Sequence, residues 1–242
     1  MEPIRLQKFF TDCDILSRRA AEEEIKNGKV LVNGIRAELG QKIDPETDVV
    51  EYGGKVIKQP AKTIYKYIML NKPRGYLSTV TDDRGRHTVT ELVADANARL
   101  YPIGRLDMDS EGLLLITNDG ELTNKLTHPK HEIPKIYHVK IEGRISEETR
   151  RALASPMVID GYKILPVKNE IVTAKNDYTV LRMTLYEGRN RQIRKMCEAH
   201  GLNILRLCRV AIGSLELGNL APGKWRYLSK SQVEYLKQGK GK

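Results

Sequence analysis

Residues 104–120 read GRLDMDSEGLLLITNDG, a short acidic loop followed by a strongly apolar segment. The apolar part of this stretch, LLLI at residues 113–116, lies between turn-forming residues on both sides. A short apolar run bounded in this way is typical of a strand that is buried on both faces. We therefore predict that residues 112–117 form a buried strand and that this strand holds the acidic loop in place.

The acidic loop could bind a cation. The first, third, fifth and sixth positions of an EF-hand calcium loop are matched by Asp107, Asp109, Glu111 and Gly112. However, the twelfth position, which needs a bidentate Glu, is Asn118, and the apolar run that follows is not an exiting helix. This excludes a calcium site of the EF-hand type. A magnesium site on Asp107 and Asp109 stays open, although no third acid lies near them in sequence.

Two further interpretations of Asp107 also stay open. Asp and Asn in loops often only satisfy their own backbone, so this could be a plain surface turn. Against that, Asp107 follows Gly104-Arg105-Leu106 and precedes the buried strand, so a rigid element positions it. An Asp that is fixed beside an Arg stays ionised and can act as a nucleophile.

The composition is that of an ordinary globular protein, with 40% hydrophobic and 30% charged residues among 242. No apolar run approaches the roughly 20 residues that a membrane helix needs, and the N-terminus has no signal-peptide core. The three cysteines are odd in number and widely spaced, which favours neither a disulfide framework nor a zinc site. We predict no membrane association and a place in the reducing cytoplasm.

The excess positive charge is concentrated in one region. The net charge is +10, and residues 1–62 hold 11 basic and 11 acidic side chains, which cancel. Residues 182–209 contain seven basic and two acidic side chains and so supply half of the excess. A local basic patch of this kind favours a polyanionic partner, usually a nucleic acid.

The N-terminal part of the chain has the pattern of a small domain. The spacing of Leu6, Phe9 and Phe10 predicts a helix. Ser17 is a good N-cap for a second helix, and the dipeptide NG at residues 33–34 predicts a β-hairpin. The order helix, helix, hairpin leaves two interpretations open: a small α+β unit with solvated charges, or an RNA-binding module.

The second interpretation gains support because this pattern resembles the RNA-binding domain named after ribosomal protein S-four. The resemblance is carried by residues 5–9 (RLQKF), 17–19 (SRR) and 28–34 (GKVLVNG). In that family, two helices and a hairpin present basic side chains to structured RNA. The resemblance implies an RNA-binding domain over residues 1–60, in which Arg18, Arg19 and Lys29 face the RNA.

A short polar segment with a proline, residues 58–63 (KQPAKT), separates this domain from a larger one over residues 64–242. Strands are predicted at residues 64–71, 135–143, 178–186 and 225–229. Helices are predicted at residues 121–126, 146–154 and 191–201, and Ser229 with Gln232 forms a capping-box pattern for a last helix. Many strands with helices at their side predict an α+β domain with a mainly antiparallel sheet, not a doubly wound one.

Four motifs of the larger domain together resemble the pseudouridine synthase family, in particular its ribosomal RNA branch of the RsuA/RluB type. They are residues 71–75 (NKPRG), 104–115 (GRLDMDSEGLLL), 135–139 (KIYHV) and 187–196 (EGRNRQIRKM). The motifs stand in the family's order, and the resemblance covers nearly the whole chain. The last motif is also amphipathic: if Asn190 begins a helix, Ile193, Met196 and Cys197 share one apolar face.

The resemblance implies an enzyme that isomerises a specific uridine of ribosomal RNA to pseudouridine and needs neither a cofactor nor a metal. It implies that Asp107 is the nucleophile, Arg194 its basic partner, and Tyr137 the residue that stacks on the uracil. Arg105, next to the nucleophile's loop, would fill the gap left by a flipped nucleotide. The contacts to RNA phosphates would come from Arg189, Arg191 and Lys195. A carboxylate can add covalently or abstract a proton, and both routes stay open.

Two other classes of protein stay open as alternatives. One is a non-catalytic RNA-binding or ribosome-assembly factor, and the other is a metal-dependent RNA-cleaving enzyme that uses Asp107 and Asp109. His128 and His131 (HPKH) are not completed to a metal site by Cys or acids, so we expect a surface role, and we expect Trp225 to pack in a strand. We predict a monomer whose partner is ribosomal RNA, free or in a pre-ribosomal particle.

Overall fold

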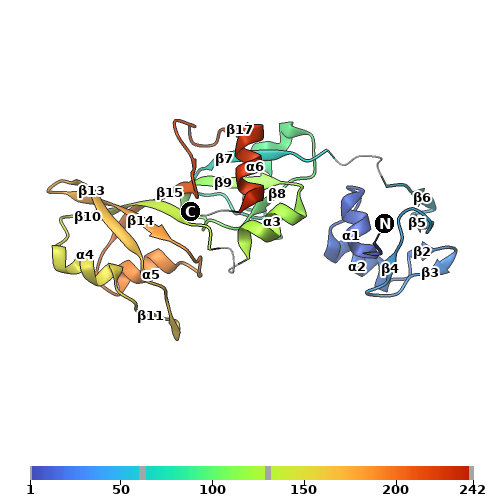
Figure 1. The fold of residues 1–242 in the computed structure, drawn as a ribbon, viewed down its shortest axis with the longest axis horizontal. Helices are drawn as coiled ribbons and strands as arrows, with labels where there is room; N and C mark the ends of the chain where they lie inside the picture. Colours follow the sequence, from blue (N-terminus) through green and yellow to red (C-terminus); the bar gives the residue numbers. More distant parts are fainter. Residues whose placement is uncertain (1, 60–63, 129–131, 240–242) are drawn as a thin grey trace. The chain divides into compact units, whose positions relative to one another are not determined.

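The structure is a computed structural model that describes residues 2–59, 64–128 and 132–239 (Figure 1). The chain divides into two compact units, Met1–Ile64 and Tyr65–Lys242. Each unit has its own hydrophobic core. The division lies just after the predicted linker, residues 58–63, whose residues 60–63 lie outside the described part of the chain.

The N-terminal unit packs two helices against short strands. The helices are α1 (Leu6–Asp12) and α2 (Arg18–Lys26). β1 (Ile4–Arg5) pairs with β4 (Lys42–Ile43). A separate sheet has the order β3-β2-β5-β6, with β2 (Val30–Val32), β3 (Ile35–Arg36), β5 (Val50–Tyr52) and β6 (Lys55–Ile57). The predicted order of helix, helix and hairpin is confirmed.

Local chemistry explains these N-terminal elements. The Ser17 hydroxyl caps α2 by accepting a hydrogen bond from the Ala20 N–H. Asn33 and Gly34 have φ of 54° and 79°, and two positive φ values in succession give the type I′ turn whose twist suits a hairpin. The predicted helical face is buried in the core of this unit, which joins α1 to the sheet; it consists of Leu6, Phe9 and Phe10.

The larger unit is built on a nine-stranded sheet whose main path is β13-β14-β10-β15-β9-β7-β17. The strands are β7 (Tyr67–Lys72), β8 (Tyr101–Ile103), β9 (Glu111–Thr117), β10 (Lys135–Glu142), β13 (Lys168–Ala174), β14 (Tyr178–Leu185), β15 (Ile204–Ile212), β16 (Leu215–Glu216) and β17 (Trp225–Tyr227). β8 and β16 pair at the side with β9 and β15. Neighbouring strands are antiparallel except for β9 and β15, which are parallel. The predicted mainly antiparallel α+β domain is confirmed.

Helices cover the sheet in two groups (Figure 1). α3 (Gly120–Thr127) and α6 (Lys230–Gln238) pack beside β8 and β9, and α4 (Glu147–Ala154) and α5 (Gln192–Glu198) share a core with β10 and β14. η1 (Glu91–Ala96) covers the other face of β7 and β9. The remaining hairpin, β11 (Val158–Ile159) with β12 (Tyr162–Lys163), lies next to α5. The capping box predicted for α6 is present, formed by Ser229 and Gln232.

β9 is the buried strand that the opening stretch predicts. Leu113 and Leu115 point into the core that contains α3 and α6, whereas Leu114 and Ile116 point into the core that contains η1. All four side chains are at most 1% exposed. A strand that is packed on both faces cannot shift its register without exposing apolar side chains, so it is a rigid base for the loop before it.

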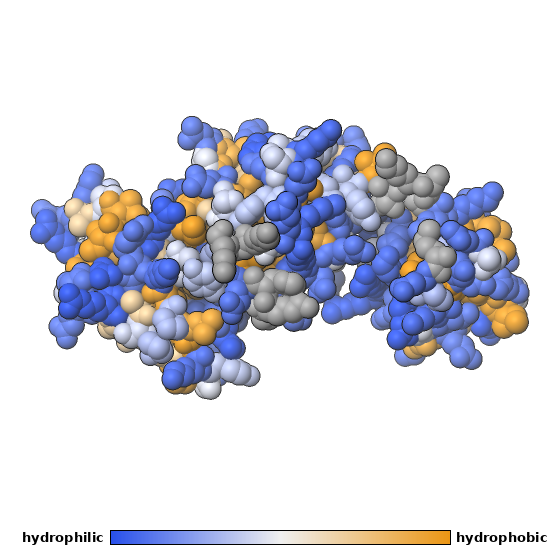
Figure 2. All heavy atoms as spheres, viewed as in Figure 1, coloured by the Kyte–Doolittle hydropathy of each residue, from blue (hydrophilic) through white to orange (hydrophobic). Residues whose placement is uncertain are grey.

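The surface of both units is mainly hydrophilic on the face shown in Figure 2, and apolar residues appear there as small separate patches. Such scattered apolar residues are normal for a protein in water. Among the described residues, no helix has both the length and the apolar character needed to cross a membrane.

Candidate active site

The loop between β8 and β9, residues 104–110, is anchored by the buried amino group of Lys72. Lys72 ends β7 and is 0% exposed. Its Nζ donates hydrogen bonds to the carbonyl oxygens of Ser110 (2.7 Å), Asp107 (3.0 Å) and Pro73 (3.1 Å). An ammonium group has three N–H donors, so each finds a backbone acceptor, and two of these acceptors belong to the loop.

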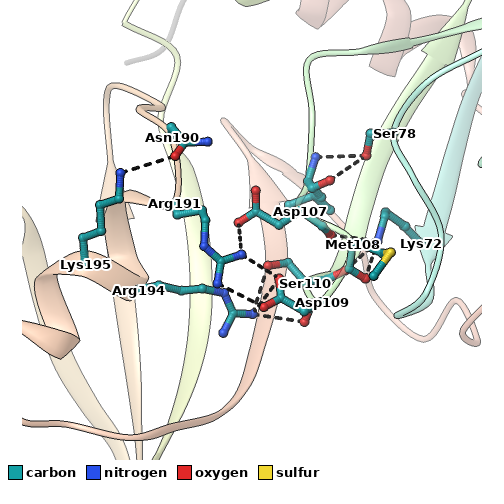
Figure 3. A network of polar contacts seen from close by, with 11 residues as sticks. Lys72, Ser78, Asp107, Met108, Asp109, Ser110, Asn190, Arg191, Arg194 and Lys195 are labelled. Atoms are coloured by element: carbon teal, nitrogen blue, oxygen red, sulfur yellow. Dashed lines mark hydrogen bonds and ion pairs between the residues drawn. The ribbon is translucent and has the colours of Figure 1, made fainter. Parts of the chain in front are cut away.

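Four further hydrogen bonds hold the same loop. The Ser78 hydroxyl donates to the Leu106 carbonyl (2.8 Å) and accepts from the Leu106 N–H (3.1 Å). The Gly75 N–H donates to the Met108 carbonyl, and the loop closes on itself where the Ser110 N–H donates to the Asp107 carbonyl. These contacts hold the Asp107 backbone from the side of β7, and the Asp107 side chain points to the opposite side (Figure 3).

Two arginines at the start of α5 approach the loop from the opposite side (Figure 3). Arg191 binds the Asp109 carboxylate with both of its terminal nitrogens, each of which donates to a carboxylate oxygen at 3.3 Å. Its Nη1 also lies 3.7 Å from Asp107 Oδ2. Arg194 Nη2 lies 3.3 Å from Asp109 Oδ1 and donates to the Asp109 carbonyl (3.0 Å) and the Ser110 hydroxyl (3.3 Å).

This arrangement differs from the predicted pairing of Arg194 with Asp107. In the structure, the guanidinium in contact with the Asp107 carboxylate is that of Arg191, and Arg194 holds Asp109 and Ser110 instead. Burial lowers the pKa of Arg194, whereas the negative charges of Asp109 and Asp107 raise it. Arg194 therefore interacts with Asp107 through charge, without a direct contact. Asp109, which the motif resemblance left without a role, is the carboxylate that ties α5 to the loop.

The start of α5 explains why these arginines face the loop. The helix begins at Gln192 rather than at Asn190, because Arg191 takes a left-handed backbone conformation with φ of 51°. Ile193, Met196 and Cys197 are buried, as the apolar face predicts. Burying that face directs Arg191 and Arg194 away from the core and toward the loop.

A cleft of about 590 Å³ opens beside the loop and brings three of the predicted motifs together. Its lining includes Arg105 and Asp107 from the loop, Lys135 and Tyr137 from β10, and Arg191 from the start of α5. Tyr137 is partly buried and packs against the cores on both sides of it. A carboxylate and an aromatic ring therefore share one concave site, which is the usual setting of an enzyme's chemistry.

The other predicted RNA-contact residues differ in whether their side chains pair with other residues of the protein. The Arg105 side chain is exposed and makes no hydrogen bond or ion pair within the part of the chain that the structure describes. Arg189 lies over the Tyr162 ring at 4.6 Å and pairs with Glu187, and Lys195 pairs with Asp160. In the N-terminal unit, Arg18 and Arg19 are exposed at the start of α2, and Lys29 is bound to Glu24.

The structure also bears on the possible metal sites and on Trp225. Among the described residues, no three His, Cys, Asp or Glu side chains are grouped so that they could hold a metal ion. The predicted surface histidine His131 lies outside the described residues. Trp225 belongs to β17, stacks edge-on against Tyr227 and donates to Asp95, so the prediction that it packs in a strand is confirmed.

The anchoring of the loop by Lys72 could not be predicted from its motif alone. The buried amino group also makes the free energy of unfolding depend on pH. Burial lowers the pKa of Lys72 to about 8, against the opposing pull of the neighbouring carboxylates. In the unfolded chain the pKa returns to 10.5, so between about pH 8 and 10.5 the unfolded state binds the extra proton.

The free energy of unfolding should therefore rise with pH in this window, relative to a Lys72→Met variant that lacks the titrating group. Between about pH 7.5 and about pH 10 the difference between the two proteins should change by about 2 kcal/mol in favour of the wild type. Urea denaturation of both proteins at the two pH values measures it, and all other titrating groups cancel in the comparison. A difference that does not change with pH would contradict the prediction.

Comparisons with known proteins agree with the geometry of the site. The family model for RNA pseudouridylate synthase matches residues 66–199, and the model for the S4 domain matches residues 15–50. The chain is 41% identical over 236 residues to ribosomal large subunit pseudouridine synthase B of Bacillus subtilis, covering 96% of this chain and 95% of that protein. It is 39% identical over 238 residues to an uncharacterised RNA pseudouridine synthase of Aquifex aeolicus, covering 98% and 94%.

A solved structure supports the same assignment. A crystal structure of a pseudouridylate synthase superposes with a TM-score of 0.66 at 31% sequence identity, covering 96% of this chain and 99% of that one. Because the family model covers more than half of the chain and the relatives align over nearly all of it, the match includes the loop, β10 and α5. The chain therefore belongs to the RNA pseudouridylate synthase family, whose members isomerise uridine in RNA, and carries an S4 domain in its N-terminal unit.

Proposed function

We propose that this enzyme converts a specific uridine of ribosomal RNA to pseudouridine and that Asp107 is its nucleophile. The observation that carries the proposal is the position of Asp107 on a loop braced by Lys72, Ser78 and two arginines, in the same cleft as Tyr137. The ribosomal substrate is supported by the Bacillus subtilis relative, a ribosomal large subunit pseudouridine synthase.

The proposed reaction breaks the bond between C1′ of the ribose and N1 of uracil and forms a bond between C1′ and C5. Asp107 either adds to C1′ or removes a proton from the sugar, and the rigid loop suits both routes because it fixes the carboxylate in place. Tyr137 would stack on the uracil and keep the detached base in the cleft while it turns. No atom is gained or lost, so the proposed chemistry calls for no external group.

The target nucleotide must leave its stack to reach Asp107, at a cost of a few kcal/mol. Arg105 is exposed at the edge of the cleft and would occupy the gap in the RNA. Arg18, Arg19 and Lys29 in the S4 domain and Arg189, Arg191 and Lys195 near α5 would supply phosphate contacts that offset this cost. We place the enzyme in the cytoplasm as a monomer that acts on ribosomal RNA or a pre-ribosomal particle.

A gene deletion tests the proposed function. Ribosomal RNA from the deletion strain, treated with a pseudouridine-specific reagent and read by reverse transcription, should lack at least one pseudouridine that the parent strain carries. The wild-type gene should restore that position, and the Asp107→Asn gene should not. If every pseudouridine survives the deletion, ribosomal RNA is not the substrate. If the Asp107→Asn gene restores the position, the protein acts as a non-catalytic factor that assists another enzyme.

Within this proposal, Arg194 and Arg191 should differ in importance. The Arg194 side chain is 17% exposed and binds a carboxylate, a carbonyl and a hydroxyl of the loop, whereas Arg191 is 44% exposed. Arg194→Ala should lower kcat by about 10²-fold to 10³-fold, and Arg191→Ala by about 10-fold. Steady-state kinetics on a ribosomal RNA fragment measures kcat and KM of both variants.

Because Arg194 acts through the loop, its loss should reduce kcat and leave KM nearly unchanged. Arg194→Lys should not restore the rate fully, because the three contacts are made by Nη2 at the far end of the guanidinium, and the shorter lysine side chain does not place its amino group there. A larger loss in Arg191→Ala than in Arg194→Ala would mean that the exposed arginine, which touches Asp107, is the essential partner.

A further inference from the structure

Two basic side chains lie deep in the cleft without any role in the site described so far. Lys135 and Arg209 both line the cleft, and Arg209 is only 4% exposed. Arg209 is the direct cross-strand neighbour of Tyr137 in the pairing of β15 with β10, and Lys135 stands two residues before Tyr137 on β10. Side chains two apart on a strand point to the same face, so the three side chains surround one part of the cleft.

Within the described residues, these two cations lack the carboxylate partners that the basic side chains around the start of α5 have. Arg209 donates from Nε to the Leu113 carbonyl (2.7 Å), and its Nη2 is buried without a hydrogen-bond partner. The Lys135 side chain makes no hydrogen bond or ion pair with any residue in the described ranges 2–59, 64–128 and 132–239. By contrast, Arg191 and Arg194 bind Asp109, and Arg189 and Lys195 bind Glu187 and Asp160.

The positive charges of Lys135 and Arg209 also repel each other. Burial and the positive charge of Arg209 both lower the pKa of Lys135. Burying a cation without a counter-charge is expensive, and placing a second one beside it adds repulsion. Negative charge beside Tyr137 would offset this cost, so these residues point to a ligand group that carries such charge there.

In the proposed reaction that group is the base itself. When the bond between C1′ and N1 breaks, both bonding electrons remain on uracil, and the detached base is an anion with its charge spread over its ring nitrogens and carbonyl oxygens. When C5 then bonds to C1′, the C5 proton is lost and N1 gains one, so the sequence is redox-neutral. We propose that Lys135 and Arg209 form an electropositive floor of the cleft that stabilises the uracil anion between these two steps. This inference rests on the proposed function.

A backbone phosphate is the competing source of negative charge. The register favours the base: directly paired residues have Cβ atoms about 5 Å apart, so a uracil stacked on Tyr137 lies within reach of Arg209. The two sources also predict different kinetics. Stabilising the anion speeds the chemical step, whereas a phosphate contact strengthens RNA binding in general.

The test uses Lys135→Met, which removes the charge from a side chain without a polar contact to any described residue, and Lys135→Arg, which keeps it. Each protein is given a ribosomal RNA fragment around the uridine that the deletion identifies, made either with uridine or with 5-fluorouridine at that position. Fluorine withdraws electrons and stabilises the detached base without help from the enzyme. The measurement is the single-turnover loss of the target nucleoside, together with the Kd of the RNA.

Lys135→Met should slow the reaction of the uridine RNA by about 100-fold. The same variant should slow the reaction of the fluorinated RNA clearly less, and the Kd of the RNA should stay nearly unchanged. Lys135→Arg should keep most of the rate. Arg209→Gln should show the same dependence on the base if it folds. An equal loss on both RNAs, a loss confined to Kd, or no loss would each overturn the electropositive floor. If the wild-type enzyme converts no uridine in ribosomal RNA, the proposed function itself fails, a separate outcome.

Discussion

Asp107→Asn should abolish pseudouridine formation, with a loss of activity on the order of 10⁴-fold or more, as expected when a nucleophile is removed. An amide has the same shape as the carboxylate but neither adds to the sugar nor takes its proton. The loop should keep its structure, because Lys72 and Ser110 hold the Asp107 backbone carbonyl and not its side chain. Pseudouridine in a nuclease digest of the RNA, measured by chromatography, gives the activity, and circular dichroism and RNA binding should match the wild type.

Asp109→Asn is the matched control, two residues away in the same loop. Its carboxylate is 47% exposed and binds Arg191 and Arg194, so its loss loosens the loop without removing the proposed nucleophile. A displacement of that kind costs at most about 100-fold, and measurable activity should remain. If Asp109→Asn is inactive and Asp107→Asn is active, the nucleophile has been assigned to the wrong acid.

Gly112→Ala should be the most destabilising single-methyl change in the loop region. Gly112 has a φ of 105°, and an added Cβ would lie 2.3 Å from the Arg209 carbonyl oxygen and 2.7 Å from the Arg209 nitrogen. Backbone strain and a clash with the neighbouring strand add together, so the free energy of unfolding should fall by about 3 kcal/mol or more. Activity should fall as well, because the clash pushes β9 and β15 apart next to the Asp107 loop.

Gly143→Ala separates the clash from the strain. Gly143 also has a positive φ, 70°, but apart from its two chain neighbours no described residue has an atom within 4 Å of an added Cβ. It should lose only about 1 kcal/mol, the cost of a left-handed conformation for an L-residue. Urea denaturation of both variants measures the two values, and equal losses would show that the parallel contact between β9 and β15 is not close-packed at this point.

Several features could be predicted from the sequence because they depend on residues close together in the chain. The hairpin at Asn33-Gly34 follows from backbone preference, and the capping box at Ser229 and Gln232 follows from a local pair of hydrogen bonds. The burial of residues 113–116 follows from their uninterrupted apolar character. The family motifs identified Asp107, Tyr137 and Arg194 as candidate site residues, and the structure brings the first two into one cleft.

The tertiary structure alone decided which of these residues touch. The parallel pairing of β9 with β15 brings Arg209 beside Gly112, and the antiparallel pairing of β10 with β15 brings it beside Tyr137. No local pattern marks the first pairing, because its partners are nearly a hundred residues apart. The same holds for Lys72 under the Asp107 loop and for Arg191 against Asp107. Local propensity acts over a few residues, whereas these contacts are set by burying two-sided strands in one sheet, which is a property of the whole unit.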